Sequence, residues 1–196
     1  MDDRHFFDKL APHWDENEVL STAKKVNEIL DYMDLKRGQD VLDLGTGTGV
    51  LLPHIAQRIG AEGSITAIDY SREMLKIAHD KFGSLNPAPE FHCMDFEQET
   101  ISGEFHRIIL YCVYPHLHFP VDTLRWLTKV NLADGGKLFI AFPCNEDFIN
   151  DIHKERHSES DMLPSAVNLA LYLNNHGLKA KVLASGAGAY VVEVTV

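Results

Sequence analysis

Long apolar runs are missing from this sequence of 196 residues. No run approaches the ~20 apolar residues that a membrane span requires. The first four residues are Met, Asp, Asp and Arg, and the apolar stretch that marks a signal peptide does not follow them. These absences predict a cytoplasmic protein that neither spans a membrane nor carries a secretion signal.

Cysteine is scarce, and the three cysteines fall within apolar runs without a Cys-x-x-Cys spacing. They are Cys93, Cys112 and Cys144. An odd number of thiols without secretory features is typical of reduced, buried cysteines. The alternative is a set of three thiolates that binds a soft metal or arsenite.

Positive charge is also low, because 18 Lys and Arg residues accompany 29 Asp and Glu residues, for a formal net charge of −11. A surface of this sign repels the phosphate backbone of nucleic acids and the anionic headgroups of membranes. We therefore expect neither nucleic acid nor a membrane as a partner. The apolar fraction of 45% and the length of the chain fit one domain with a full core.

Two kinds of apolar pattern alternate along the chain. Short continuous runs predict buried strands, and apolar residues three or four positions apart predict helices. The expected strands cover 40–44, 64–69, 91–94, 107–112, 137–142, 178–184 and 189–196. The expected helices cover 19–33, 49–60, 72–83, 120–130, the start of 145–161, and 164–175. The order predicts an α/β fold, with a Rossmann-like, doubly wound, seven-stranded and mostly parallel sheet whose last strand is antiparallel and lies at the edge.

The segment after the first expected strand combines glycines with acidic residues. Three glycines there are separated by single threonines: Gly45, Gly47 and Gly49. Asp43 precedes them, and Asp69 ends the next strand. In a dinucleotide-binding loop the third glycine would fall at Val50, and an acid before the loop would repel a pyrophosphate. The segment instead favours a nucleoside whose ribose needs hydrogen-bond acceptors and whose tail is cationic.

Four polar or aromatic residues fall at the ends of four expected strands: Asp43, Asp69, Asp95 and Tyr111. Ligands bind at the carboxyl ends of the strands in open α/β sheets, so we expect these side chains to meet in one crevice. The plainer interpretation is that aspartates at strand ends cap helices and turns. Three of them in succession, with glycines beside the first, favour a binding site.

With these residues the chain resembles the class I S-adenosylmethionine-dependent methyltransferases over about residues 5–196. The resemblance implies S-adenosylmethionine as the cofactor. It also implies that Asp69 accepts hydrogen bonds from both ribose hydroxyls. Four loop residues would let the backbone approach the methionine and ribose portion of the cofactor: Gly45, Thr46, Gly47 and Gly49.

The same resemblance assigns the residues around the adenine. Tyr70 and Met74 would flank the ring, Asp95 would accept a hydrogen bond from its amine, and Phe96 would lie beside it. Asp43 and Tyr111 complete the expected cofactor set.

The N-terminal residues 1–36 are expected to form a lid and a helix, followed by one compact S-adenosylmethionine-binding unit at 37–196. The opening segment is aromatic and includes Phe6, Phe7 and Trp14. It is similar to the N-terminal lid of small-molecule methyltransferases of the quinone-methylating type. A lid that closes over a sulfonium excludes water and fixes the line of attack. Packing of an N-terminal arm is the plainer interpretation.

The methyl acceptor is expected to meet the cofactor after the fourth strand, in residues 111–120. This segment lacks the polar-Pro-Pro-aromatic signature of methyltransferases that modify nucleobases or glutamine. His116 is a candidate general base, because an unperturbed imidazole pKa of about 6.5 suits proton transfer at neutral pH. A histidine that only packs or faces solvent explains the same residue.

A second polar cluster follows the fifth strand and contains Asn150, His153 and His157. With His116 and His118 it would offer ligands to a divalent metal. A solvated helix face is the alternative, and we expect no metal. Residues 148–153 and 161–164 resemble a bacterial subgroup of methyltransferases of unassigned substrate, in which this region covers the acceptor. Asn150 and His153 are therefore expected at the substrate site beside His116.

The expected function is in-line transfer of a methyl group from S-adenosylmethionine to a small-molecule acceptor. One alternative is a non-catalytic S-adenosylmethionine-binding protein. Another is a nicotinamide-dependent oxidoreductase built on a related sheet. A homodimer is possible.

Overall fold

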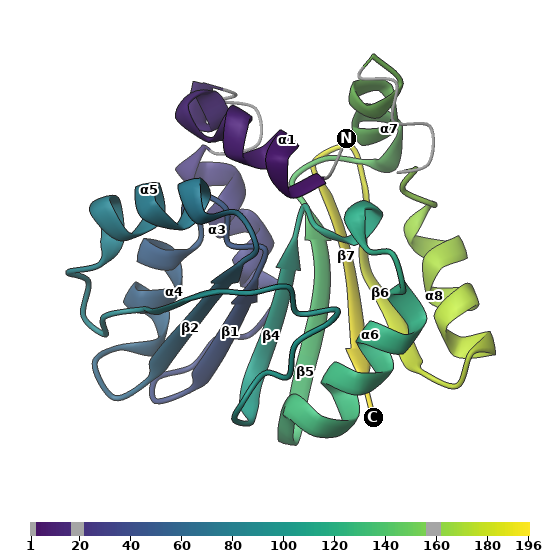
Figure 1. Ribbon diagram of the computed structural model, residues 1–196. Coiled ribbons are helices and arrows are strands. Elements are labelled where there is room, and N and C mark those ends of the chain that lie inside the picture. Colours follow the sequence, from purple (N-terminus) through teal and green to yellow (C-terminus); the bar gives the residue numbers. More distant parts are fainter. Residues whose placement is uncertain (1–2, 17–21, 156–161) are drawn as a thin grey trace.

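Seven strands form one sheet, and helices cover both of its faces (Figure 1). The computed structural model describes residues 3–16, 22–155 and 162–196. The strands are β1 (Asp40–Leu44), β2 (Ser64–Asp69), β3 (Glu90–Cys93), β4 (Phe105–Tyr111), β5 (Leu132–Phe142), β6 (Lys179–Gly186) and β7 (Ala189–Thr195). The longer helices are α1 (Asp3–Leu10), α3 (Ala23–Asp31), α4 (Leu52–Ile59), α5 (Arg72–Phe82), α6 (Pro120–Trp126), α7 (Glu146–Glu155) and α8 (Ala166–Asn175). Shorter helical segments are η1 (Ala11–Glu16), η2 (Tyr114–His116) and η3 (Leu127–Asn131).

The strand order across the sheet is β3-β2-β1-β4-β5-β7-β6. Strand β7 runs antiparallel to both of its neighbours, β5 and β6, and the other neighbouring strands are parallel. The seven-stranded, doubly wound, mostly parallel sheet with an antiparallel last strand is therefore confirmed. The expectation that this strand lies at the edge is wrong. The chain passes through α8 into β6, which takes the edge position, and the hairpin then returns β7 into the space beside β5.

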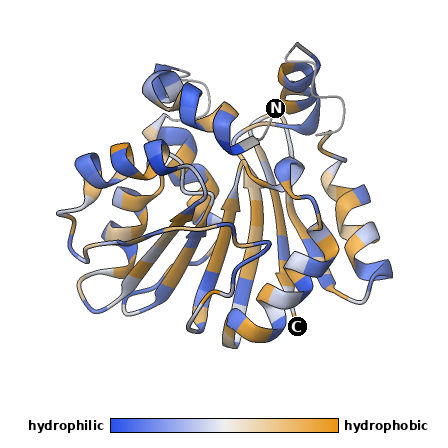
Figure 2. Cartoon of the chain, viewed as in Figure 1, coloured by the Kyte–Doolittle hydropathy of each residue, from blue (hydrophilic) through white to orange (hydrophobic). Residues whose placement is uncertain are grey.

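The sheet buries apolar side chains on both faces, which divides the core into two clusters. In β4, Ile108 and Leu110 belong to one cluster, whereas Ile109 and Tyr111 belong to the other. This alternation arises because successive side chains of a strand point to opposite faces. Helices α6 and α8 contribute to the first cluster, and α3 and α4 contribute to the second. The central strands are accordingly mostly hydrophobic (Figure 2), as expected for strands that are covered on both faces.

Local signals explain where the helices next to the glycine segment begin. Ser71 caps α5, because its hydroxyl oxygen accepts a hydrogen bond from the backbone N–H of Met74 at 3.2 Å. The helix expected over 49–60 begins only at Leu52, because residues 47–51 form turns. The glycine segment is therefore a loop for its whole length.

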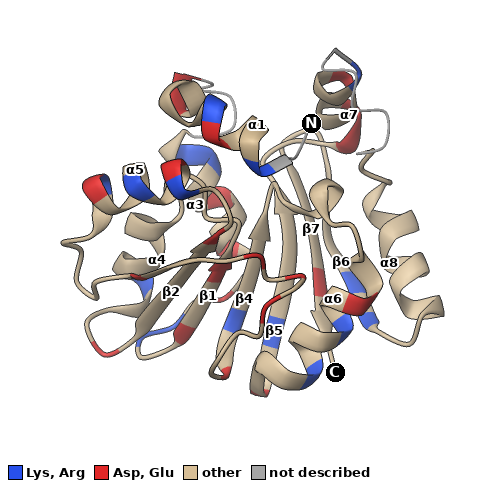
Figure 3. Ribbon diagram, viewed as in Figure 1, with Lys and Arg blue, Asp and Glu red and all other residues tan. Residues whose placement is uncertain are grey.

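Two helical segments, α1 and α7, lie over the carboxyl ends of the parallel strands (Figure 1). This is the end of an open α/β sheet at which ligands bind. Charged residues are spread over most helices and loops, whereas α8 contains none (Figure 3). No helix within the described ranges is long and apolar enough to cross a membrane.

Two glycines with positive φ, Gly49 and Gly38, differ in how closely other atoms surround them. Gly49 has φ 84° and Gly38 has φ 77°, values that favour glycine. A Cβ atom added at Gly49 would lie 2.9 Å from side-chain carbons of Leu52 and Phe82. At Gly38 it would meet no non-neighbouring atom of the described chain within 4 Å.

We expect Gly49→Ala to lower the free energy of unfolding by about 2–4 kcal/mol, from backbone strain and overpacking together. Gly38→Ala is the matched control and should lose only the backbone part, about 1–2 kcal/mol. Urea unfolding followed by circular dichroism measures both losses. Equal losses in the two variants would contradict a packing role for Gly49.

Candidate functional site

A cavity of about 260 Å³ lies beneath α1 and η1, at the carboxyl ends of the parallel strands. Most residues proposed from the sequence line it: Asp43, Gly45, Thr46, Gly47, Asp69, Tyr70, Met74, Asp95, Phe96, Tyr111, His116 and His153. The side chains at the strand ends thus meet in one crevice, as the sequence predicts. Gly49 and Asn150 are not among the lining residues.

The carboxylate of Asp69 holds the glycine loop against the end of β2. Its Oδ2 accepts the backbone N–H of Gly47 at 2.8 Å, and its Oδ1 accepts the N–H of Ser71 at 2.8 Å. The backbone N–H of Thr46 donates to the carbonyl of Ile68 at 2.9 Å. Gly47 has φ 56°, and a Cβ atom there would point at the indole nitrogen of Trp14, 3.7 Å away. The loop is therefore fixed in a form in which the main chain of Gly45 and Gly47 faces the cavity between threonines.

Asp43 and Asp69 are both buried, at 2% and 5% exposure. The pKa of Asp43 is raised to about 7, mainly by burial. The hydrogen bond from the Thr46 hydroxyl at 2.7 Å lowers the pKa, and the charge of Asp69 raises it. Burial also raises the pKa of Asp69 to about 6, although the N–H groups of Ser71 and Gly47 lower it. No lysine or arginine is among the described residues that line the cavity. A cationic ligand would therefore favour the ionised form of both carboxyl groups.

The N-terminal segment is fastened over the cavity at two places. At the first, the Ser71 hydroxyl donates to Oδ1 of Asp8 at 2.6 Å. Arg4 Nε donates to the carbonyl oxygen of Tyr70 at 2.6 Å. The residues that follow β2 thus bind Asp69 on one side and α1 on the other.

Asp15 makes the second attachment. Its carboxylate accepts the Thr48 hydroxyl at 2.6 Å and the Lys81 ammonium at 2.8 Å. Partial burial alone would raise the pKa of Asp15, but the hydrogen bonds from Lys81 and Thr48 outweigh it and the pKa is lowered. This anchor connects η1 to the glycine loop and to α5. The N-terminal segment therefore closes directly over the loop that Asp69 holds.

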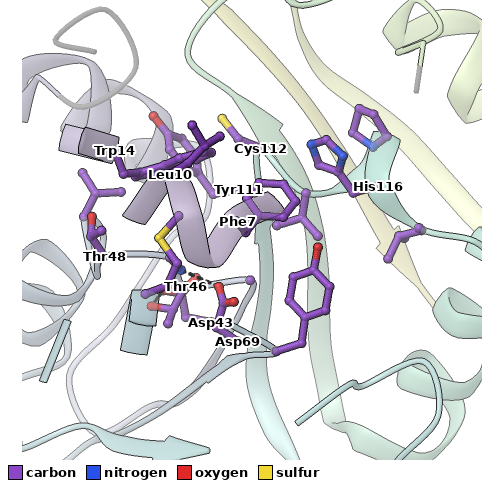
Figure 4. Close-up of a pocket in the computed structure, with 18 of the residues that line it drawn as sticks. Phe7, Leu10, Trp14, Asp43, Thr46, Thr48, Asp69, Tyr111, Cys112 and His116 are labelled. Carbon is purple, nitrogen blue, oxygen red and sulfur yellow. Dashed lines mark hydrogen bonds between the residues drawn. The ribbon is translucent and has the colours of Figure 1, made fainter. Parts of the chain in front are cut away.

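Aromatic rings form the roof of the cavity (Figure 4). The ring of Phe7 lies 5.6 Å from Trp14, 5.9 Å from Tyr70 and 5.3 Å from His116, between ring centroids. His116 in turn lies 5.4 Å from His153, which belongs to α7 and is buried. The two candidate histidines, which come from different segments, therefore face each other at one end of the cavity.

Asn150 has a different role from the one expected at the substrate site. Its side-chain amide donates to the carbonyl oxygen of Leu163 at 2.9 Å and accepts the N–H of Leu163 at 2.7 Å. Both polar groups of Asn150 are thus used to join α7 to the segment before α8. Gly49 lies against Leu52 and Phe82 and is not among the residues that line the cavity.

The structure groups no three potential metal ligands within residues 3–16, 22–155 and 162–196. His157, which the sequence analysis considered as a ligand beside His153, lies outside these ranges. Cys93 is exposed, whereas burial raises the pKa of the Cys112 and Cys144 thiols, the latter to about 11.

Cys112 and Glu97 are among the lining residues that the sequence analysis did not assign to the site. Cys112 has φ 60°, which is unusual outside glycine, at the turn from β4 toward η2. Glu97 follows Asp95 and Phe96 in the loop after β3. Asp95 itself accepts the N–H of Glu97 at 3.0 Å and the side-chain amide of Gln98 at 2.6 Å, so it also caps a turn.

Comparisons with known proteins agree with this geometry. A family model described as a methyltransferase domain matches residues 41–135. A malonyl-[acyl-carrier protein] O-methyltransferase of Acetivibrio thermocellus is 31% identical over 121 residues, which is 61% of this chain and 42% of that protein. A demethylmenaquinone methyltransferase of Listeria welshimeri is 35% identical over 79 residues, which is 38% of this chain and 34% of that protein. The chain thus spans less than half the length of these relatives.

A solved structure of a SAM-dependent methyltransferase from Aquifex aeolicus superposes with a TM-score of 0.73 and 23% identity, and the match covers 95% of this chain and 97% of that one. This likeness shows the fold. Together with the family match over residues 41–135, it supports the resemblance to the class I S-adenosylmethionine-dependent methyltransferases. Residues 41–135 carry the methyltransferase domain, and S-adenosylmethionine is the cofactor of this class. The nicotinamide-dependent alternative finds no support.

The residues present fit this cofactor. Asp43 and Asp69 are buried carboxyl groups in a cavity lined by no lysine or arginine of the described chain, so they suit a ligand that carries positive charge. Gly47 presents bare main chain beneath Trp14. Tyr70 and Met74 supply flat and flexible apolar surface next to Asp69.

The raised pKa of Asp43 makes the stability of the fold depend on pH. Between the ordinary pKa of 3.8 and the folded value of about 7, the folded chain holds a proton on Asp43 that the unfolded chain has released. The free energy of unfolding therefore falls as pH rises through this range.

Asp43→Asn keeps an acceptor for the Thr46 hydroxyl and removes the ionisable group. We expect it to raise the free energy of unfolding of the ligand-free protein by ~2–4 kcal/mol at pH 8, and by less at pH 5. Urea unfolding at the two pH values measures the difference. A loss of stability that is the same at both values would contradict the assignment.

Proposed function

We propose that the chain transfers the methyl group of S-adenosylmethionine to a small-molecule acceptor by in-line displacement. The observation that carries the proposal is the arrangement of Asp69, whose carboxylate lines the cavity while it holds the glycine loop through Gly47. The cofactor supplies an activated methyl group on a sulfonium when it is bound. The chain would then contribute mainly proximity and alignment, which are worth on the order of 7–11 kcal/mol.

The expected cofactor residues divide by position in the cavity. Asp69 would accept hydrogen bonds from the ribose, and Asp43 and the main chain of residues 45–47 would lie along the methionine portion. Four residues would enclose the adenine: Tyr70, Met74, Asp95 and Phe96. Tyr111, at the end of β4, would stand between the cofactor and the acceptor.

The N-terminal segment would act as the lid of this site. Asp8 binds Ser71 before α5, and Asp15 binds Thr48 of the glycine loop and Lys81 of α5. Phe7 and Trp14 form the roof of the cavity. A closed roof excludes water from the sulfonium and fixes the direction of attack. We accordingly propose a lid and helix over 1–36 and a cofactor-binding unit over 37–196.

The acceptor end of the cavity supports a small and uncharged substrate. Its described lining includes Val113, Pro115, Phe142 and Ile149, with His116 and His153 as the nearby polar groups. The cavity volume of about 260 Å³ is below the roughly 300–1,000 Å³ that is usual for small-molecule sites, so little room is left beside the cofactor. The names of the two relatives describe different acceptors and therefore support methyl transfer rather than one substrate.

His116 is the proposed general base for an acceptor that must lose a proton. Its ring lies between Phe7 of the roof and His153 of α7. An imidazole at this position would take the proton of an O–H, N–H or S–H group as the methyl group is attacked. His153, which is buried, would orient the ring of His116.

A non-catalytic binding protein is the second candidate, and the small volume of the cavity is the observation that favours it. One experiment separates the two functions. Calorimetry with S-adenosylmethionine and S-adenosylhomocysteine tests binding, and a screen of small acceptors with the methyl-labelled cofactor tests transfer. Binding with labelled product supports the enzyme, binding without any product supports the second candidate, and no binding contradicts both.

The role of Asp69 predicts both an affinity and its pH dependence. Asp69→Asn should weaken binding of S-adenosylmethionine by about 1.5–3 kcal/mol, the range for a hydrogen bond to a charged group. In the unmodified protein the affinity should rise from pH 5 to pH 8, because Asp69 and Asp43, with pKa values of about 6 and about 7, ionise in this interval.

Calorimetry at both pH values measures these effects, and Asp69→Asn should reduce the pH dependence to the part that Asp43 contributes. The matched control is Asp40→Asn, at the opposite end of β1, which should bind as the unmodified protein does. Unchanged affinity in Asp69→Asn would mean that the ribose is held elsewhere.

The role of His116 predicts a separation of binding from turnover. His116→Ala should leave the affinity for S-adenosylmethionine within a factor of about 3 and should lower the rate of methyl transfer by about 10²–10⁴-fold, the range for a lost general base. His92→Ala, on the edge strand β3, is the matched control. Rates measured with an acceptor from the screen test this, and full activity of His116→Ala would remove the residue from the base role.

A further inference from the structure

Glu97 is a cavity-lining carboxylate that the proposed function has not used. It follows Asp95 and Phe96, on the adenosine side of the cavity, and its side chain is only 8% exposed. A carboxylate this well buried needs several donors to remain in place. The donors that hold it come from another part of the chain.

Four hydrogen bonds join Glu97 to the start of α6. Oε2 accepts the backbone N–H of His118 at 2.9 Å and lies 3.2 Å from Nδ1 of the same residue. Oε1 accepts the N–H of Phe119 at 2.9 Å and the hydroxyl of Thr123 at 3.0 Å. The carboxylate therefore spans the loop after β3 and the segment after β4.

Both of these segments contribute residues to the lining of the cavity. Asp95 and Phe96 line it from the loop after β3, where the adenine would lie. Residues 115–118, which include His116, line it from the segment after β4, where the acceptor would lie. Any displacement of Glu97 that accompanies adenine binding would reach the acceptor side through the N–H groups of His118 and Phe119.

We propose that Glu97 is a positioning residue that couples occupancy of the adenosine end of the cavity to the order of residues 114–119. This inference rests on the proposed function. It makes the position of His116 depend on the bound cofactor, through one side chain that both segments share. The acceptor side would be well ordered only when the cofactor is in place.

A helix cap is the plainer role for the same carboxylate. Phe119, the residue before α6, supplies no side-chain cap of its own, and Pro120 has no N–H. Glu97 accepts the N–H groups of His118 and Phe119 just before the helix and the hydroxyl of Thr123 within its first turns. A cap alone would order residues 118–123 equally with and without a ligand, so the dependence on ligand separates the two roles.

Hydrogen exchange followed by NMR measures this dependence, because the amides of His118 and Phe119 are themselves the donors to Glu97. Exchange rates are compared with and without saturating S-adenosylhomocysteine. In the unmodified protein the ligand should slow the exchange of these two amides by about fivefold or more, the lower range of allosteric coupling. It should also slow the amides of Gly47 and Ser71, which report binding itself.

Glu97→Gln preserves the shape of the side chain and replaces one acceptor oxygen by an NH₂ group, so at least one of the two amides loses its acceptor. In this variant the ligand should no longer slow the amide, His118 or Phe119, that has lost its acceptor, while Gly47 and Ser71 remain slowed. Glu99→Gln is the matched control. Glu99 lies in the same loop and accepts only the N–H of Asp95 among the hydrogen bonds of the described chain, so its replacement should leave both responses intact.

Two results would overturn the coupling: ligand that slows Gly47 and Ser71 but leaves His118 and Phe119 unchanged in the unmodified protein, or Glu97→Gln that retains the full response. The first needs no variant, so it decides the matter even where Glu97→Gln fails to fold. An absence of slowing at Gly47 and Ser71 together with no binding by calorimetry removes the proposed function, and this inference with it.

Discussion

The pair of hydrogen bonds from Gly47 and Ser71 to the carboxylate of Asp69 is the interaction on which the rest of the site depends. It fixes the glycine loop to the end of β2. It also fixes Ser71, whose hydroxyl binds Asp8 of the N-terminal segment. One buried carboxyl group therefore positions the floor of the cavity and, through one residue, its roof. Burial at this position raises the pKa of Asp69 to about 6, because the buried carboxylate loses contact with water.

Much of the fold follows from the sequence because its signals are local. Continuous apolar runs mark strands that are buried on both faces, and a carboxylate after such a run marks the carboxyl end of a strand. Asp43 and Asp69 could be assigned to the cavity in this way. The position of β7 inside the sheet could not, because a hairpin permits either strand to take the edge.

The parts that sequence analysis missed depend on contacts between distant segments. Asn150 has the polarity of a substrate ligand, but both of its polar groups are used by Leu163, 13 positions away. Gly49 continues the glycine pattern, yet its neighbours are side chains of α4 and α5. The sequence around Glu97 is charged, which is typical of a surface loop. Its side chain is nevertheless buried, because it is hydrogen-bonded to His118, 21 positions away.

A crystal structure of the chain with S-adenosylhomocysteine is the most direct test of the central claim. The account predicts that the ribose hydroxyls lie within hydrogen-bonding distance of the Asp69 carboxylate, with the glycine loop still attached to it through Gly47. An adenosine bound elsewhere, with Asp69 contacting only protein, would contradict the account.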